Sequence, residues 1–221
     1  AHEHVHAWAG GSGTGPETLD HNRYLLNAPE PAILDAGAVD LAADYLMAGH
    51  SLGEHKILTP HAGELERFLR RIHEHSPQRW EEILDGALVP SREDINAEPF
   101  RWVRAACELS GATVMLKGST TLIAAPVGAT YSVHGATGWL ATAGSGDTLT
   151  GILGALLAQY MAAAQERHEQ VEGCTYASLA ALAVYLHNRA ALALLDGLKG
   201  PVPPSRVRSE EHTSELQSRD S

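Results

Sequence analysis

The chain has 221 residues, a length that suits one domain with a sizeable hydrophobic core. It carries 16 Lys and Arg against 27 Asp and Glu, and this net charge of −11 argues against broad nucleic-acid binding, which needs clustered cations. Two cysteines are too few for a disulfide framework, so we expect a reduced, cytoplasmic protein. The most apolar stretch, residues 177–195, is interrupted by His187, Asn188 and Arg189, which predicts a mostly buried helix rather than a membrane span.

Strand-like and helix-like segments alternate along the chain, which predicts an α/β fold with helices around a mostly parallel sheet. At the start, His2, His4 and His6 alternate as on the exposed side of a first strand. Strands are then expected at residues 31–35, 56–58 and 113–117, with a hairpin formed by residues 121–125 and 130–134. Helices are expected at residues 38–47, 60–72, 96–109, 145–159 and 179–194. In the second of these, Thr59 is the expected N-cap and Pro60 the first helical residue. The polar residues 76–93 give no assignment.

A glycine-rich turn stands directly before one of the expected helices, in residues 141–147. Gly144 and Gly146 allow a sharp turn that exposes backbone N–H groups to an anion, and the helix dipole favours negative charge at the same point. Asp147, in the first helical turn, would lie beside a bound phosphate and could accept a proton from a substrate hydroxyl. Residues 141–147 therefore favour phosphoryl chemistry. A purely structural role of Asp147 at the helix start stays open.

Residues 141–147 resemble the anion-hole motif of ribokinase-like enzymes, and in particular that of the ADP/ATP-dependent NAD(P)H-hydrate dehydratases. Further stretches agree with this family in order and rough spacing: residues 11–15, 33–36, 58–65 and 114–118. The resemblance covers residues 1–200 and implies a three-layer ribokinase-like fold. In open α/β sheets ligands bind outside the carboxyl ends of the strands, which is where Asp35, His61 and Lys117 are expected.

The resemblance also implies an activity. Members of the family use ADP or ATP with Mg²⁺ to phosphorylate the ring hydroxyl of the S-epimer of hydrated NADH or NADPH, and loss of phosphate restores the reduced cofactor. Asp147 would be the catalytic base and contact the substrate, together with Gly13, Gly15 and His61. The nucleotide would be bound by Lys117, Gly118, Ser119, Thr120, Thr121, Gly144 and Gly146. No metal-ligand set is expected from the protein itself.

The sequence departs from the family pattern in several places. Ser12 and Ala62 stand where the family has proline, Gly37 replaces a second acid after Asp35, and Thr137-Gly138-Trp139 stands where many relatives have Asn-Pro-Gly. These departures keep two other functions open: a ribokinase-like kinase of a vitamin precursor, of the hydroxyethylthiazole type, and a nucleotide-binding module without catalysis. The Thr-Pro-His-x-Gly-Glu stretch at residues 59–64 favours the dehydratase.

The two ends lead to expectations of their own. The chain opens at Ala1 without a methionine, and family members carry further strands before the first glycine loop, so we expect the N-terminal part of the fold to be missing. We assign residues 1–207 to the partial domain and 208–221, which resemble the translation of a sequencing adapter, to a non-native disordered tail. We further expect a homo-oligomer, no nucleic-acid or membrane partner, and a fused or separate epimerase for the same metabolite.

Overall fold

The computed structural model describes residues 4–13 and 19–195, so Gly15 and the predicted tail 208–221 lie outside it. Its centre is a six-stranded sheet in which the strands follow one another in chain order. The first four strands are parallel, and the last two are antiparallel to their neighbours. The strands are β1 (Trp8–Gly10), β2 (Ala32–Leu34), β3 (Lys56–Leu58), β4 (Thr113–Leu116), β5 (Thr121–Ala124) and β6 (Thr130–Val133).

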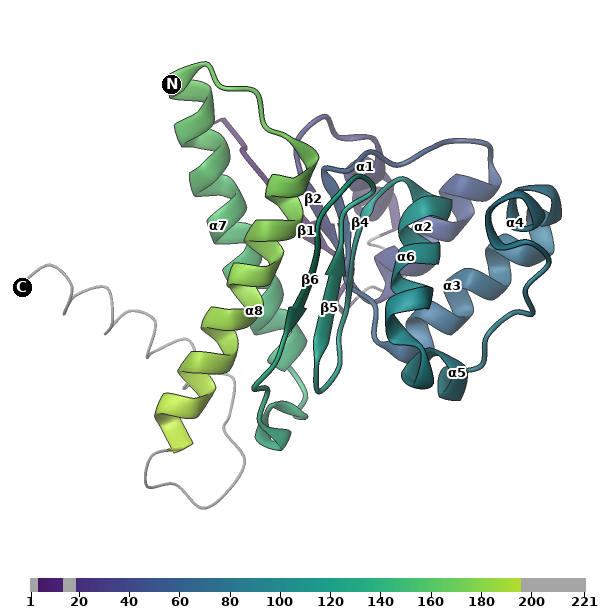
Figure 1. Cartoon of the computed structure of the whole chain (residues 1–221). Helices are drawn as coiled ribbons and strands as arrows, with labels where there is room; N and C mark the ends of the chain where they lie inside the picture. The colour runs from purple at the N-terminus through teal and green to yellow at the C-terminus, as the bar shows by residue number, and fades with distance from the viewer. Residues whose placement is uncertain (1–3, 14–18, 196–221) are drawn as a thin grey trace, which may run out of the picture.

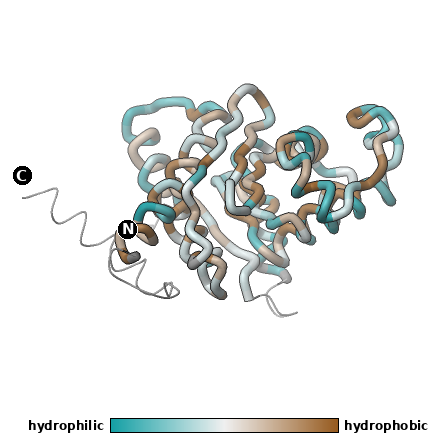
Figure 2. Tube along the Cα trace, turned by 60° about the horizontal axis from the view of Figure 1, so that its bottom comes forward, coloured by the Kyte–Doolittle hydropathy of each residue, from teal (hydrophilic) through white to brown (hydrophobic). Residues whose placement is uncertain are grey.

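Helices cover both faces of this sheet, which gives three layers (Figure 1). One face carries α1 (Leu19–Asn27), α2 (Gly37–Met47), α3 (Ala62–His75), α4 (Pro77–Leu84), α5 (Arg92–Ala97) and α6 (Pro99–Ser110). The other face carries two long helices, α7 (Ser145–Arg167) and α8 (Gly173–Leu195), preceded by the short 3₁₀ helix η2 (Gly138–Leu140). The connection from α7 to α8 is hydrophilic (Figure 2).

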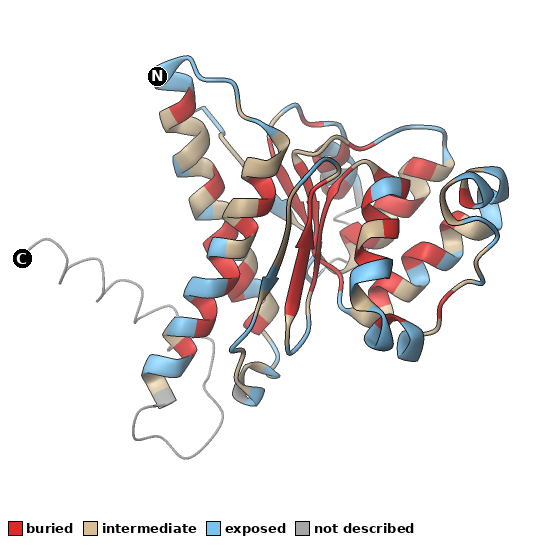
Figure 3. Ribbon diagram, viewed as in Figure 1, coloured by how far each residue is buried: buried red, intermediate tan, exposed pale blue. Residues whose placement is uncertain are grey.

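The strands alternate their side chains between two hydrophobic cores, as the period of two along a strand requires. Leu34, Leu58 and Val114 join the core under α1–α6, whereas Ile33, Ile57 and Met115 join the core under α7 and α8. The central strands are therefore buried along their whole length, as a sheet covered on both faces must be (Figure 3). This confirms the predicted α/β architecture with a mostly parallel central sheet.

Several predicted boundaries are wrong. The helix after β3 begins at Ala62 with His61 as its N-cap, and Thr59 instead directs its hydroxyl to the Asp35 carboxylate. The unassigned polar segment contains α4 and the start of α5, α1 was not expected, and α7 runs beyond residue 159 to Arg167. Residues 4–7, with His4 and His6, lie outside β1, and His2 lies outside the described residues.

Helix α8 is long and apolar enough to cross a membrane by length and composition, over Gly173–Leu194. Its inner face, however, packs against α7 and strands β4, β5 and β6, with Ala177, Ala180 and Val184 buried. Its outer face leaves four large apolar side chains exposed: Leu182, Tyr185, Leu186 and Leu192. The predicted burial of this helix is therefore correct for one face only.

Candidate functional site

The carboxyl ends of the four parallel strands meet at one edge of the sheet. Backbone hydrogen bonds continue past the strands there: the Asp35 N–H donates to the Gly10 carbonyl at 3.0 Å, and the Lys117 N–H donates to the Pro60 carbonyl at 2.8 Å. An isolated parallel bridge joins His61 to Lys117. The three residues that the sequence analysis placed after separate strands, Asp35, His61 and Lys117, therefore lie at the same sheet edge, as expected.

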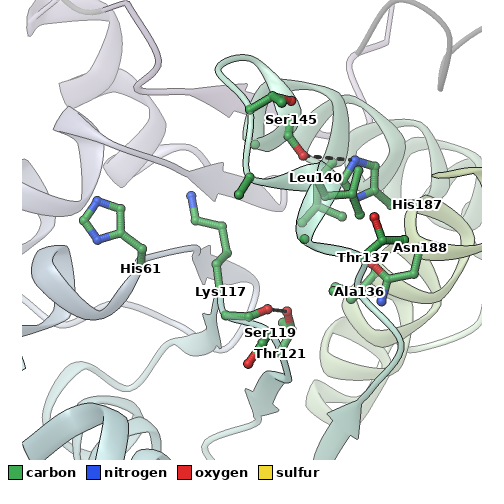
Figure 4. A pocket seen from close by; sticks show the side chains of 17 residues that line it. His61, Lys117, Ser119, Thr121, Ala136, Thr137, Leu140, Ser145, His187 and Asn188 are labelled. Carbon is green, nitrogen blue, oxygen red and sulfur yellow. Dashed lines mark hydrogen bonds between the residues drawn. The ribbon is translucent and has the colours of Figure 1, made fainter. Parts of the chain in front are cut away.

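A cavity of about 600 Å³ opens at this edge, a volume typical of small-molecule sites. The ends of β3 and β4 and the segment after β4 form one wall, and the 136–142 segment with the start of α7 and residues 184–188 of α8 forms the other. Figure 4 shows Lys117 standing between His61 on one side and Leu140, Ser145 and His187 on the other.

Lys117 is held by a buried carboxylate. Its Nζ donates to Asp35 Oδ1 at 2.6 Å, and the same oxygen accepts a hydrogen bond from Thr59 Oγ1 at 2.8 Å. The Asp35 side chain is only 6% exposed, whereas that of Lys117 is 23% exposed and reaches the cavity. A charged hydrogen bond of this length is among the strong ones. Both residues were expected at this edge of the sheet, but their pairing was not.

The N-terminus of α7 faces this ammonium group. Gly144 is the N-cap with φ 86°, a left-handed conformation that favours glycine, and no side chain caps the helix there. Among the described residues, no hydrogen-bond acceptor lies on the N–H of Gly146 or Asp147. A Cβ built on Gly146 would lie 3.8 Å from both Lys117 Nζ and Asp35 Oδ2, so the turn and the Lys117–Asp35 pair adjoin. Open N–H groups, a helix dipole and a fixed ammonium around one point make an anion site.

His61 has a structural task as well as a place in the cavity wall. Its Nδ1 accepts hydrogen bonds from the N–H groups of Gly63 and Glu64 at 3.0 and 3.2 Å, and Glu64 Oε2 accepts from the His61 N–H at 2.8 Å. This capping box holds the start of α3. Because Nδ1 accepts, the hydrogen-bond network assigns the proton of the neutral ring to Nε2, which lies 3.6 Å from Glu64 Oε1 and can donate to a ligand.

Two polar residues of α8 also line the cavity and were missed as site residues. His187 is 4% exposed and its Nε2 lies 3.5 Å from Ser145 Oγ, at the first turn of α7. Burial lowers the pKa of His187, which keeps the ring neutral. The Nδ2 group of Asn188 donates to the His134 carbonyl at 3.5 Å. Their sequence signal is the polar interruption of an apolar helix, which packing explains as well as function does.

The cavity brings together part of the predicted site. It is lined by six of the predicted residues: His61, Lys117, Gly118, Ser119, Thr121 and Gly146. Asp147 is exposed in the first turn of α7 and is not part of the lining, and no capping hydrogen bond involves its side chain in the described chain. Gly13 and Thr120 are also not part of the lining. Gly13 is exposed in the loop after β1, with φ 67°. The Thr120 hydroxyl lies 3.2 Å from His134 Nδ1.

The described residues contain no group of three or more His, Cys, Asp and Glu side chains that could hold a metal ion. Mg²⁺ in phosphoryl-transfer sites keeps several waters and is held by one or two carboxylates together with the phosphates of the substrate. Asp147, exposed in the first turn of α7, supplies one carboxylate beside the anion site, so the residues present fit a metal that arrives with a nucleotide.

Comparison with known proteins decides the family. A family model described as NAD(P)H-hydrate dehydratase matches residues 1–199. The chain belongs to this family. The resemblance that residues 11–15, 33–36, 58–65, 114–118 and 141–147 suggested is thereby confirmed.

Curated dehydratase-family relatives are longer than this chain. This chain is 36% identical over 158 residues to the bifunctional NAD(P)H-hydrate repair enzyme Nnr of Mycobacterium tuberculosis. The match covers 70% of this chain and 28% of that protein. It is 35% identical over 161 residues to the ADP-dependent (S)-NAD(P)H-hydrate dehydratase of Neisseria meningitidis, covering 70% and 48%. The chain thus spans less than half of the length of either relative.

Solved structures confirm the fold of the family. The ADP/ATP-dependent NAD(P)H-hydrate dehydratase of Bacillus subtilis, co-crystallised with ATP and Mg²⁺ and soaked with CoA, superposes with a TM-score of 0.65 at 24% identity, over 95% of this chain and 66% of that one. A ribokinase-like superfamily protein of Enterococcus faecalis gives 0.66 at 21% identity, over 92% and 61%. The ribokinase-like fold predicted from sequence is therefore confirmed.

Proposed function

We propose that this chain carries a nucleotide-dependent dehydratase activity on hydrated NADH or NADPH. ATP or ADP would phosphorylate the hydroxyl of the S-epimer, and elimination of phosphate would restore the reduced cofactor. Family membership supports the reaction class, and one observation in the structure supports the site: the Lys117 ammonium and the open N-terminus of α7 converge at Gly146.

The nucleotide phosphates would bind where that convergence lies. The N–H groups of Gly146 and Asp147 and the ammonium of Lys117 would surround the terminal phosphoryl group, and Gly118, Ser119 and Thr121, which line the cavity after β4, would contact the remaining phosphates. Phosphoryl transfer depends mainly on positioning and on stabilisation of charge on the transferred group, which this arrangement provides. Mg²⁺ would supply further neutralisation of the phosphate oxygens.

The substrate would lie on the side of His61 and the loop after β1 that contains Gly13. The His61 Nε2–H group is a donor there, because Nδ1 is occupied by the start of α3. Asp147, exposed in the first turn of α7, would accept the proton of the hydroxyl group as the hydroxyl oxygen forms a bond to the terminal phosphorus. At the same time the bond between that phosphorus and the bridging oxygen breaks, and ADP leaves from ATP, or AMP from ADP. Loss of the new phosphate ester as inorganic phosphate, with a proton from the adjacent ring carbon, then forms the ring double bond.

Product analysis separates this function from its alternatives. Incubation of hydrated NADH with Mg²⁺ and ATP or ADP should yield inorganic phosphate and NADH in equal amounts. A small-molecule kinase of the same fold would release a stable phosphoester and leave the hydrate unchanged. The departures at Ser12, Gly37 and Ala62 motivate the second alternative, a binding module, which would bind the nucleotide without any turnover.

Assembly and partners are part of the proposal. The exposed side chains Leu182, Tyr185, Leu186 and Leu192 form an apolar stripe on α8, which supports the expectation of a homo-oligomer. Light scattering at two protein concentrations tests it, and a strictly monomeric mass would end it. The relatives named bifunctional repair enzymes support a fused or separate epimerase that acts on the same metabolite.

A further inference from the structure

Asp35 is the one carboxylate among the described residues that contacts the cationic group of the anion site. It lies 82 positions before Lys117 in the chain, yet their side chains meet at 2.6 Å beneath the N-terminus of α7. Buried ion pairs contribute little net stability, because desolvation of both charges offsets their attraction. Since stability does not account for the pair, the location of Asp35 beside Gly146 points to a functional role in the anion site.

The backbone around Asp35 is fixed from both sides. Its N–H donates to the Gly10 carbonyl and its own carbonyl accepts from the Ala38 N–H at 2.9 Å. A Cβ on Gly11 would come within 1.7 Å of the Asp35 carbonyl oxygen, so only glycine allows this close approach. The next residue, Ala36, has φ 44°, which is a strained conformation for an L-residue, and such strain concentrates at functional sites.

The side chain of Asp35 is fixed as well. Thr59, fully buried at the end of β3, donates its hydroxyl to the same carboxylate oxygen that accepts from Lys117. A lysine side chain has four rotatable carbon–carbon bonds, and its free ammonium would sample many positions in the cavity. An anchored carboxylate confines that ammonium to one position.

We propose that Asp35 is a positioning residue for phosphoryl transfer: anchored by Thr59, it holds the Lys117 ammonium beneath the Gly146 turn. The inference rests on the proposed function and deepens it. Lys117 is then preorganised for the charge that develops on the transferred phosphoryl group, and this costs no reorganisation during the reaction. The role of Asp35 is to fix where the positive charge lies, and Asp35 itself contacts no reacting atom.

The first test measures the confinement of Lys117 without any need for activity. The chain has three lysines, so acylation of Lys117 by an amine-reactive ester can be followed by peptide mass spectrometry, with Lys199 as internal reference. In Asp35→Asn the ammonium is released, and we expect Lys117 to react at least about threefold faster, the effect of losing a partly exposed ion pair. Asp40→Asn, which removes a carboxylate paired with Arg67 on the surface, is the matched control and should leave the rate unchanged. An unchanged rate in Asp35→Asn overturns the proposal.

Thr59→Val keeps the shape of the side chain and both members of the ion pair but removes one anchor of the carboxylate. We expect a smaller acceleration of Lys117 acylation in this variant. If Asp35→Asn does not unfold cooperatively on heating, the test rests on Thr59→Val. An unaltered rate of Lys117 acylation in Thr59→Val then overturns the inference.

The second test uses turnover. We expect Asp35→Asn to lower kcat by about 10- to 100-fold while KM for ATP changes by less than about threefold, because the charge remains but its position is lost. In a Lys117→Met background the same substitution should have no further effect on kcat, since there is no ammonium to position. A loss of equal size in both backgrounds would show that Asp35 acts independently of Lys117. If the wild-type chain has no dehydratase activity, the proposed function fails, while the acylation test still decides the positioning role.

Discussion

Replacement of Gly146 by alanine should impair anion binding without lowering the stability of the fold. The backbone of Gly146 is not in the left-handed region, and a Cβ there would meet its nearest atoms, Lys117 Nζ and Asp35 Oδ2, at 3.8 Å. This is ordinary van der Waals contact, so the alanine side chain fits without strain. Alanine is also the better helix former by up to about 1 kcal/mol, so we expect the melting temperature to stay equal or to rise by about 2–4 °C.

The same methyl group should impair nucleotide binding. Cα–Cβ bonds in a helix tilt toward its N-terminus, so the methyl would project toward the anion and occupy the space between the Gly146 N–H and the Lys117 ammonium. A phosphate oxygen has to approach both donors to about 2.9 Å. We expect the affinity for ADP with Mg²⁺ to fall at least about tenfold, a loss of about 1.4 kcal/mol or more.

Titration calorimetry of ADP with Mg²⁺ measures this effect, and Gly151→Ala is the matched control. Gly151 lies in the same helix with no atom within 4 Å of its built Cβ, so the control should show the same trend in stability and wild-type affinity for ADP. Wild-type ADP affinity in Gly146→Ala would refute the placement of the phosphates at this turn.

Two further predictions concern stability as a function of pH. Burial lowers the pKa of His187, so the unfolded chain binds a proton at this residue more readily than the folded one. The free energy of unfolding should therefore fall as pH drops below about 6.5, and the part due to His187 should be absent in His187→Gln when urea unfolding is compared at pH 7 and 5.5. Burial lowers the pKa of Lys56 from 10.5 to about 8, so keeping it charged in the folded state costs stability at neutral pH. The free energy of unfolding of the wild type, measured relative to that of Lys56→Gln, should rise by up to about 3 kcal/mol between pH 8 and 10.5. If this difference between the two proteins does not change with pH, the burial of a charged amine is contradicted.

The parallel core of the fold was predictable because its signal is local. Short apolar runs that end in Asp35, Thr59 and Lys117 became the strands β2, β3 and β4 almost without change. Helices α1, α4 and α5 were missed, since they are short or polar and depend on tertiary packing for their stability. The wrong N-cap has a specific cause: Thr59 and His61 both suit a helix start, and the carboxylate of Asp35, which is distant in sequence, competes for the Thr59 hydroxyl.

The candidate site was predictable in its residue types but not in its contacts. Glycine turns and a lysine at a strand end are visible as motifs, and they led to Lys117 and Gly146 in the cavity wall, whereas His61 came from the family resemblance of the Thr-Pro-His stretch. The pairing of Lys117 with Asp35 depends on strand order, which no local pattern encodes. His187 was missed because a buried histidine in an apolar helix looks the same whether it faces a cavity or the core.

The central claim is that this site dehydrates hydrated NADH by way of a phosphoryl transfer in which Asp147 accepts the proton. The most direct measurement is the recovery of NADH absorbance from hydrated NADH with Mg²⁺ and ATP or ADP, for the wild-type chain and for Asp147→Asn. Since the Asp147 side chain is exposed and does not cap α7 by a hydrogen bond, the variant should unfold at the wild-type temperature. We predict nucleotide-dependent recovery by the wild type and a rate about 10²- to 10⁴-fold lower in the variant. A folded wild-type chain that recovers no NADH, or a variant that retains the full rate, would contradict the account.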